Sequence, residues 1–363
     1  MLLGEIPHDF DFATNCPLSV TKTLFTRVFS TGESHGTLSV LYDDHLFEVT
    51  RFRKDISTDG RRALVSYSDS IEEDQKRRDI RINSLAYDVV EERVVDSQEG
   101  LKDFESKMIR FVGKAKERIL EDHLRAIRYI RIIARLKSFG FGYDPEEMEQ
   151  VVAVFDSSKL SLERIYEEIT KINQIRYRDK DFCSRHLARL NIFSPYFDKE
   201  EQAATVVKSV IEKESFFPFC FEYNQTHSVK ETVIALKLSK KHKKILNLLN
   251  RFKNCDFSKT IQVKELLSQI ATQDIKETAK AFLDTYNVDL LEQFYGILSR
   301  KEPIHPTDLA ISGNAIKKMG YKGEKAGKIL RFLQEKVWKD PHLNQPEILR
   351  QLASKMAKMG SGL

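Results

Sequence analysis

The chain has 363 residues, which is enough for roughly two to four domains with a sizeable core. Its net charge of +5 and its pI near 8.8 permit a polyanionic partner without requiring one. We find no run long enough to span a membrane and no signal peptide at the start, so we expect a cytoplasmic protein. Four cysteines lie far apart without CxxC or Cys/His spacing, which favours reduced thiols over a zinc site or disulfides: Cys16, Cys183, Cys220 and Cys255.

The first notable stretch is Asp9-Phe10-Asp11, which is followed by Phe12. On a strand, this spacing places both carboxylates on one face and both phenylalanines on the other. Two such carboxylates repel each other unless a cation lies between them, and Mg²⁺ is held by one or two carboxylates plus substrate phosphates. The stretch predicts a two-carboxylate metal site for nucleotidyl transfer, although an isolated Asp-x-Asp is more often a solvated strand face.

A β-hairpin is predicted next. Residues 36–42 alternate in polarity, Asp43-Asp44 marks a turn, and residues 45–53 alternate back. Glu48 on the second strand is either a third carboxylate beside the aspartates of an adjoining strand or an ordinary surface residue.

Two basic stretches follow the hairpin. Residues 51–62 are polar and contain an Asp59-Gly60 turn signal, which predicts a mobile basic loop. Arg77 and Arg78 directly precede Asp79, and guanidinium forks match phosphate geometry. This second stretch therefore serves a triphosphate or forms a salt-bridged surface.

From about residue 101 onward the pattern becomes helical, most clearly over residues 121–136. The apolar stripe of this helix contains Leu124, Ile127, Ile130 and Ile133/Ala134. A second face carries successive i+3 neighbours, Asp122, Arg125, Arg128 and Arg131. Because three arginines on one face repel each other, the pattern favours an anionic neighbour; a salt-bridge ladder with Glu121 and Asp122 is the equal alternative.

The pattern of the remaining residues predicts helices. Two of these helices begin within a cluster of lysines. Ser239 is the expected N-cap of one, and cations in its first turn oppose the helix dipole: Lys240, Lys241, Lys243 and Lys244. The other follows a glycine-rich turn, residues 320–327, where helix N–H groups could meet a phosphate. Its basic residues are Lys317, Lys318, Lys322, Lys325, Lys328 and Arg331. Each cluster is either a phosphate contact or a solvated face.

Ten short stretches of this kind occur in a fixed order along nearly the whole chain: residues 2–14, 35–37, 47–53, 59–62, 77–83, 96–100, 109–113, 121–125, 163–165 and 308–313. Together they resemble the class II nucleotidyltransferases, which are the tRNA CCA-adding enzymes and the related bacterial poly(A) polymerases. The resemblance implies an α+β fold with a small mixed-sheet, polymerase-β-like head followed by an all-α neck, body and tail. The implied boundaries are 1–107 for the catalytic head, 108–177 for the base-recognising neck, 178–265 for the body and 266–363 for the tRNA-binding tail.

The resemblance also implies roles for individual residues. Asp9 and Asp11 would hold two Mg²⁺ ions, one activating an RNA 3′-hydroxyl and one clamping the triphosphate, with Glu48 as the auxiliary carboxylate. Ribose and triphosphate would be held by Arg78, Asp79 and Asn83, and the triphosphate also by Arg128 and Arg131. Asp122 and Arg125 would read the edge of the incoming base, accepting C and A and rejecting G and U.

The function so implied is the addition of CCA, or part of it, to tRNA 3′ ends from CTP and ATP. His35-Gly-Thr37 and the 308–313 stretch lie closer to CCA-adding members, and residues 51–62 resemble the flexible loop that switches from C to A. An A-adding enzyme or a poly(A) polymerase is the alternative, and a non-catalytic RNA-binding protein with a degenerate head is the second. Met1 falls where the residue after the family's Gly-Gly and Val-Arg-Asp should be. We therefore expect this chain to be weak or inactive, and about thirty upstream residues that carry the phosphate-binding turn to give activity.

Overall fold

The structure is a computed structural model that describes residues 2–4, 10–58, 63–175 and 179–359. The chain divides into two compact units, Met1–Phe216 and Phe217–Leu363. In the described residues, the strands all lie within unit 1 and unit 2 is helical, so the α+β prediction is confirmed. The finer division into head, neck, body and tail stays a prediction. None of the described helices is both long enough and apolar enough to cross a membrane.

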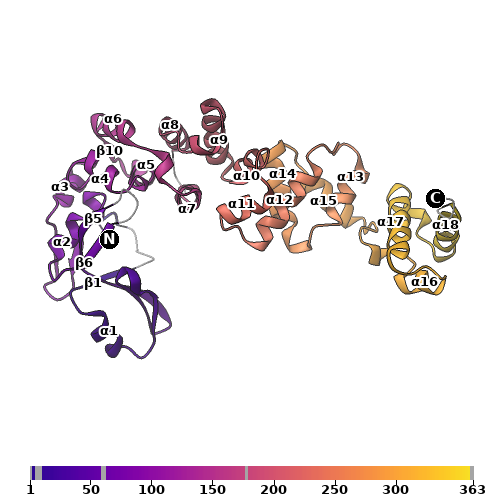
Figure 1. The fold of residues 1–363 in the computed structure, drawn as a ribbon, viewed down its shortest axis with the longest axis horizontal. Helices are drawn as coiled ribbons and strands as arrows, with labels where there is room; N and C mark the ends of the chain where they lie inside the picture. Colours follow the sequence, from indigo (N-terminus) through magenta and orange to yellow (C-terminus); the bar gives the residue numbers. More distant parts are fainter. Residues whose placement is uncertain (1, 5–9, 59–62, 176–178, 360–363) are drawn as a thin grey trace. The chain divides into compact units, whose positions relative to one another are not determined.

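A four-stranded mixed sheet opens unit 1, with the order β1-β4-β3-β2. Its strands are β1 (Asp11–Thr14), β2 (Val28–Gly32), β3 (Thr37–Tyr42) and β4 (His45–Arg51). The predicted hairpin is confirmed as β3 and β4, which pair antiparallel from Tyr42 and His45 upward. Asp43 and Asp44 have φ values of 47° and 58°, the left-handed pair that matches a two-residue turn to the strand twist. β1, which is labelled in Figure 1, lies at the sheet edge and pairs parallel with β4.

A second hairpin contradicts the loop predicted for residues 51–62 over the described part of that range, residues 51–58. β5 (Arg53–Thr58) pairs antiparallel with β6 (Ala63–Tyr67), and the Phe52 N–H donates to Thr14 O at 2.8 Å. The loop prediction weighed polarity and missed the β-branched residues that favour a strand here. The turn signal Asp59-Gly60 lies outside the described residues. Two further short pairs complete the described strands: β7 (Ala86–Asp88) with β8 (Arg93–Val95), and β9 (Met108–Ile109) with β10 (Gly142–Tyr143).

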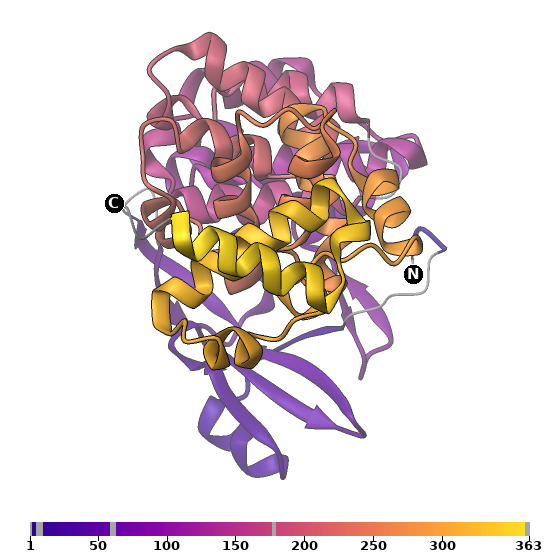
Figure 2. The same ribbon diagram turned by 90° about the vertical axis from the view of Figure 1, so that its right-hand side faces the viewer.

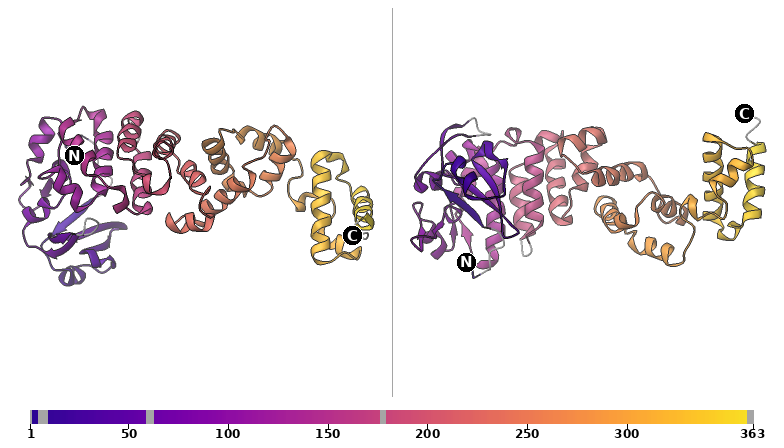
Figure 3. Two further views of the ribbon diagram at one scale, coloured as in Figure 1. Left: turned by 45° about the horizontal axis from the view of Figure 1, so that its top comes forward. Right: turned by 90° about the horizontal axis from the view of Figure 1, so that it is seen from below.

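Helices make up the rest of unit 1 (Figure 3). They are α1 (Leu18–Leu24), α2 (Ile71–Lys76), α3 (Gly100–Glu105), α4 (Ala115–Glu121), α5 (Leu124–Leu136), α6 (Pro145–Val154), α7 (Leu162–Asn173), α8 (Lys180–Arg189) and α9 (Glu200–Lys213). α5 packs against α4, α7 and α8. Its predicted apolar stripe is confirmed, since Ile127, Ile130 and Ile133 are fully buried.

The helix predicted from residue 121 begins later than expected. α4 ends at Glu121 and α5 begins at Leu124, with Asp122 between them in an extended conformation (φ −157°, ψ 107°). The Asp122 carboxylate accepts the Leu124 N–H at 3.1 Å, a local side-chain bond that competes with helix continuation. Asp122 therefore stands at a junction between two helices and not on the arginine-bearing face of α5.

Unit 2 consists of helices joined by short loops in its described part (Figures 2 and 3). They are α10 (Phe217–Tyr223), α11 (Val229–Ala235), α12 (Lys240–Phe252), α13 (Thr260–Leu267), α14 (Ile275–Tyr286), α15 (Leu291–Ser299), α16 (Gly313–Lys318), α17 (Gly323–Lys339) and α18 (Pro346–Met359). Ser239 is the N-cap of α12, as predicted, and its hydroxyl accepts the His242 N–H at 3.2 Å. None of the four cysteines, which all lie in described segments, forms a disulfide.

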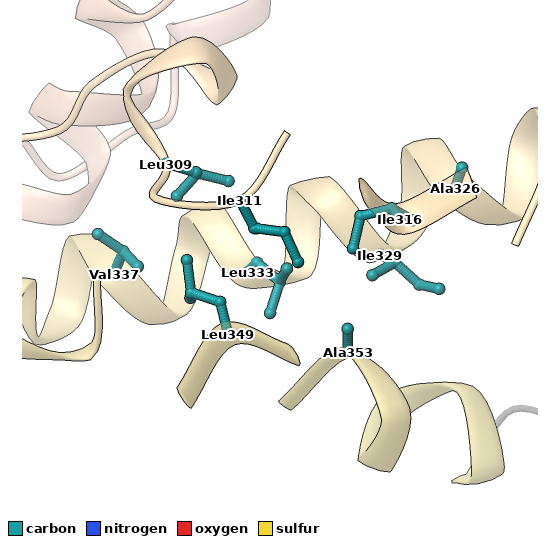
Figure 4. Packing of buried hydrophobic residues seen from close by; sticks show 9 residues of the cluster. All are labelled: Leu309, Ile311, Ile316, Ala326, Ile329, Leu333, Val337, Leu349 and Ala353. Carbon is teal, nitrogen blue, oxygen red and sulfur yellow. The ribbon is translucent and has the colours of Figure 1, made fainter. Parts of the chain in front are cut away.

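The C-terminal helices share a separate apolar cluster, shown in Figure 4. It contains Leu309, Ile311, Ile316, Ala326, Ile329, Leu333, Val337, Leu349 and Ala353. The end of α17 is also tied to α13, because the buried Lys264 Nζ donates to Trp338 O at 2.9 Å and pairs with Glu302 at 2.6 Å. Apolar burial and one buried ion pair thus hold this end of the chain together.

Candidate functional site

Two carboxylates meet on the sheet of unit 1. Asp11 opens β1, and its Cα partner on the parallel strand β4 is Glu48. Aligned residues of adjacent strands point to the same face, and both side chains are exposed. Phe12 takes the opposite face and packs edge-on against Phe47, with ring centroids 5.7 Å apart. The register that brings Glu48 beside Asp11 is confirmed, whereas Asp9 lies outside the described residues.

One residue of the predicted triphosphate motif, Asp79, contacts α5. Asp79 is buried; its Oδ1 accepts the Ile80 N–H at 2.9 Å and its Oδ2 accepts Arg128 Nε at 2.7 Å. Arg78 directs its guanidinium to the Asp74 Oδ2, with Nη2 at 2.8 Å. Asn83 is exposed at the end of a 3₁₀ turn. The structure therefore brings Asp79 and Arg128 into direct contact.

The two predicted base-reading residues have separate partners. The Arg164 guanidinium donates to both oxygens of Asp122, at 3.1 and 2.8 Å. Arg125 donates from Nη1 to Glu121 Oε2 at 2.6 Å and from Nη2 to the Arg77 carbonyl at 3.2 Å. Arg125 thus reaches back to the residue that precedes the Arg78-Asp79 motif.

The arginine face of α5 is compensated by acids of the chain itself. Arg128 pairs with Asp79, and Arg131 Nε donates to the buried Glu168 of α7 at 2.7 Å. Of these three arginines, Arg125 pairs with Glu121 as the predicted salt-bridge ladder requires, whereas Arg128 and Arg131 pair with acids of other segments. The mutual repulsion of the arginines therefore does not by itself require an external anion, and the roles of Arg128 and Arg131 toward a triphosphate stay predictions.

Arg164 contacts one of the predicted site residues, Asp122, although the sequence pattern predicted no role for it. It belongs to the 163–165 stretch, which carried the family resemblance but received no role. Its partner Asp122 lies 42 positions earlier in the chain. Helical periodicity cannot detect a pair at that separation, so the only usable signal was the motif itself.

The junction beside Asp122 also holds a buried histidine. His123 is 4% exposed, and its Nδ1 accepts the backbone N–H of Asp156 at 3.0 Å. This bond requires Nδ1 to be unprotonated, and burial lowers the pKa of His123, although Asp156 and Asp122 oppose the shift. The bond joins the α4–α5 junction to the segment that leads into α7.

This arrangement predicts a pH effect on stability. Because the pKa of His123 is lower in the folded state, the unfolded chain takes up the proton first, and stability is lost as the pH falls below the ordinary histidine range. His123→Asn keeps an acceptor near Nδ1 but does not titrate, so the melting temperature of the variant should fall less than that of the wild type between pH 7.5 and about 5. Buried His186 has a lowered pKa as well, so its contribution remains in both proteins. Parallel melting curves would contradict the assignment.

The two lysine clusters of unit 2 lie at the surface. Lys240, Lys243 and Lys244 are exposed on α12. Lys241 is exposed too but is engaged by Glu277 and, at 3.5 Å, by Asp274, which favours a structural role for it. In the second cluster Lys325 lies over the Tyr321 ring, 5.5 Å from its centroid. The other predicted RNA contacts are exposed around the start of α17: Lys317, Lys318 and Lys322.

Known proteins are similar to this chain in both sequence and fold. Residues 1–110 match the Poly A polymerase head domain. The chain is 30% identical over 296 residues to the CCA-adding enzyme of Staphylococcus aureus (strain Newman), which is 80% of this chain and 68% of that enzyme. The chain belongs to the CCA-adding enzyme family of nucleotidyltransferases.

Within the CCA-adding enzyme family, the mitochondrial CCA tRNA nucleotidyltransferase 1 of Homo sapiens is 37% identical over 183 residues. That match covers 47% of this chain and 41% of the human protein, so it spans less than half of that relative's length. The Bacillus stearothermophilus CCA-adding enzyme, solved in complex with CTP, has the same fold: the TM-score is 0.73 at 22% identity, over 100% of this chain and 92% of that one. The predicted α+β fold class, with a small sheet-containing head followed by helices, is thereby confirmed.

Proposed function

We propose that this protein is a template-independent nucleotidyltransferase that adds CCA, or part of it, to tRNA 3′ ends from CTP and ATP. The observation that supports it most directly is the pair of exposed carboxylates, Asp11 and Glu48, aligned on adjacent strands. The chain also belongs to the CCA-adding enzyme family, which supports a nucleotidyl-transfer role for this pair of carboxylates. The proposed compartment is the cytoplasm.

The carboxylate pair fits a hard divalent cation, because carboxylate oxygens are the ligands that Mg²⁺ takes together with substrate phosphates. Asp11, with Asp9, would hold Mg²⁺ ions. When bound, such ions lower the pKa of a hydroxyl and neutralise triphosphate charge. Glu48, the strand partner of Asp11, would receive the proton of the RNA 3′-hydroxyl.

The nucleotide would be held between the sheet region and α5. Arg78 and Asn83 would contact triphosphate and ribose, and the buried Asp79 would orient the ribose while holding Arg128 in place. Arg131 would add positive charge near the phosphates, and Asp122 with Arg125 would read the base edge. Cytosine and adenine both present an exocyclic amine, which a carboxylate accepts; uracil and guanine present a carbonyl there.

The tRNA would lie against exposed lysines of unit 2. We propose Lys240, Lys243 and Lys244 on α12 and the cluster at the start of α17 as phosphate contacts. Such contacts release counterions, so tRNA affinity should fall steeply with added salt.

The proposal is tested with a tRNA transcript that ends before CCA, incubated with CTP, with ATP and with both. We expect both nucleotides to be consumed and extension to stop at CCA. Consumption of ATP alone would indicate an A-adding enzyme, and long A tails would indicate a poly(A) polymerase. Absence of incorporation alongside retained tRNA binding would contradict the proposal and support a non-catalytic binding protein.

A further inference from the structure

We propose that Arg164 is a positioning residue that determines which hydrogen bonds Asp122 offers to an incoming base. The inference rests on the proposed function, because it concerns the same nucleotide. Arg164 Nη1 donates to Asp122 Oδ1 at 3.1 Å, and Nη2 donates to Oδ2 at 2.8 Å. This is the bidentate geometry, in which two parallel hydrogen bonds from a guanidinium fix the plane of a carboxylate.

The bonds at Asp122 leave little acceptor capacity. Oδ1 accepts from Arg164 and, at 3.1 Å, from the Leu124 N–H, so both of its lone pairs are used. Among the residues that the structure describes, Oδ2 accepts only from Arg164, which leaves one lone pair open. Asp122 therefore has a single acceptor position for a base, in a fixed direction.

One fixed acceptor is what distinguishes the four bases at this edge. The exocyclic amine of cytosine or adenine donates into the open position, whereas the carbonyl of uracil or guanine meets it lone pair to lone pair. A freely rotating carboxylate would discriminate less, because it could turn away from a carbonyl. The orientation that Arg164 imposes thus contributes to selectivity without any contact between Arg164 and the base.

Contacts of neighbouring residues hold the backbone of both Arg164 and Asp122 in place. Arg164 lies on α7 next to the fully buried Ile165, and one turn later Glu168 of the same helix binds Arg131 of α5. On the other side, the bond between His123 and Asp156 secures the residue after Asp122. The side chains of Asp122 and Arg164 are 24% and 27% exposed, so a solute can reach the carboxylate. The pair is fixed in place and accessible.

The test measures dissociation constants for CTP and UTP by isothermal titration calorimetry. Arg164→Met keeps the length of the side chain but removes its donors, and Arg164→Lys keeps the charge but not the fork. Arg189→Met on α8 is the matched control, because Arg189 donates to both oxygens of Glu149 at 3.0 and 2.7 Å. We expect R164M to reduce the preference for CTP over UTP by about 5- to 150-fold, R164K to reduce it less, and R189M to leave it unchanged.

Circular dichroism melting curves verify that each variant is folded. If R164M does not fold, the ratio of the UTP and CTP dissociation constants of R164K decides whether Arg164 has the positioning role. A CTP preference in R164M or folded R164K equal to that of the wild type would overturn the positioning role, and so would a wild type without such preference. A wild type that binds CTP selectively but does not extend tRNA would contradict the proposed function alone, since binding selectivity is measured without catalysis.

Discussion

Replacement of Asp11 by alanine is expected to lower nucleotide incorporation by about 1,000-fold while tRNA affinity stays the same. Asp11 is exposed at the edge of the sheet and faces the same side as Glu48. Its removal therefore costs no buried contact, and the lost carboxylate is one that would hold the catalytic cation. Single-turnover extension of a tRNA lacking CCA gives the rate, and a gel-shift titration gives the affinity.

Asp181→Ala is the matched control, because Asp181 is an exposed aspartate on α8. This variant should keep the wild-type rate. A D11A rate within a few-fold of the wild type would show that this carboxylate does not serve the chemistry. A parallel loss of tRNA affinity would instead indicate damage to the fold.

The carboxylate pair could be predicted from sequence because it depends on strand alternation alone. The period of two places Asp11 opposite in direction to Phe12, and the turn at Asp43 and Asp44 fixes where β4 begins. With β1 alongside β4, Glu48 becomes the neighbour of Asp11. Local rules therefore carried this part of the site.

The contacts that the arginines of α5 and α7 make could not be predicted in the same way. Arg128 bonds Asp79 across 49 positions, Arg131 bonds Glu168 across 37, and Arg164 bonds Asp122 across 42. Which acid meets which arginine is decided by how α5 packs against its neighbours, and helical spacing is silent about that. Asp122 adds a local conflict, since its side chain caps Leu124 and breaks the helix that the apolar period predicts.

Replacement of Leu333 by alanine is expected to destabilise the C-terminal part of unit 2 by about 2–5 kcal/mol. Leu333 is fully buried on α17, in the cluster that includes Leu309 and Leu349 (Figure 4). The loss of its side chain would leave a cavity among the helices that present the lysines around Gly323. Weaker tRNA binding should follow, whereas CTP binding should be unchanged because the proposed nucleotide residues lie in unit 1.

Trp338 makes this prediction measurable, because it is the single tryptophan of the chain and is 8% exposed at the end of α17. Its fluorescence during urea denaturation reports the unfolding of this region, and calorimetry reports CTP binding. Ile234→Ala on α11 is the control, since Ile234 is 66% exposed and its loss should change stability by no more than about 0.5 kcal/mol. A shift of under about 1 kcal/mol for L333A would mean that the cluster tolerates the cavity. A simultaneous loss of CTP binding would contradict the separation of nucleotide binding in unit 1 from tRNA binding in unit 2.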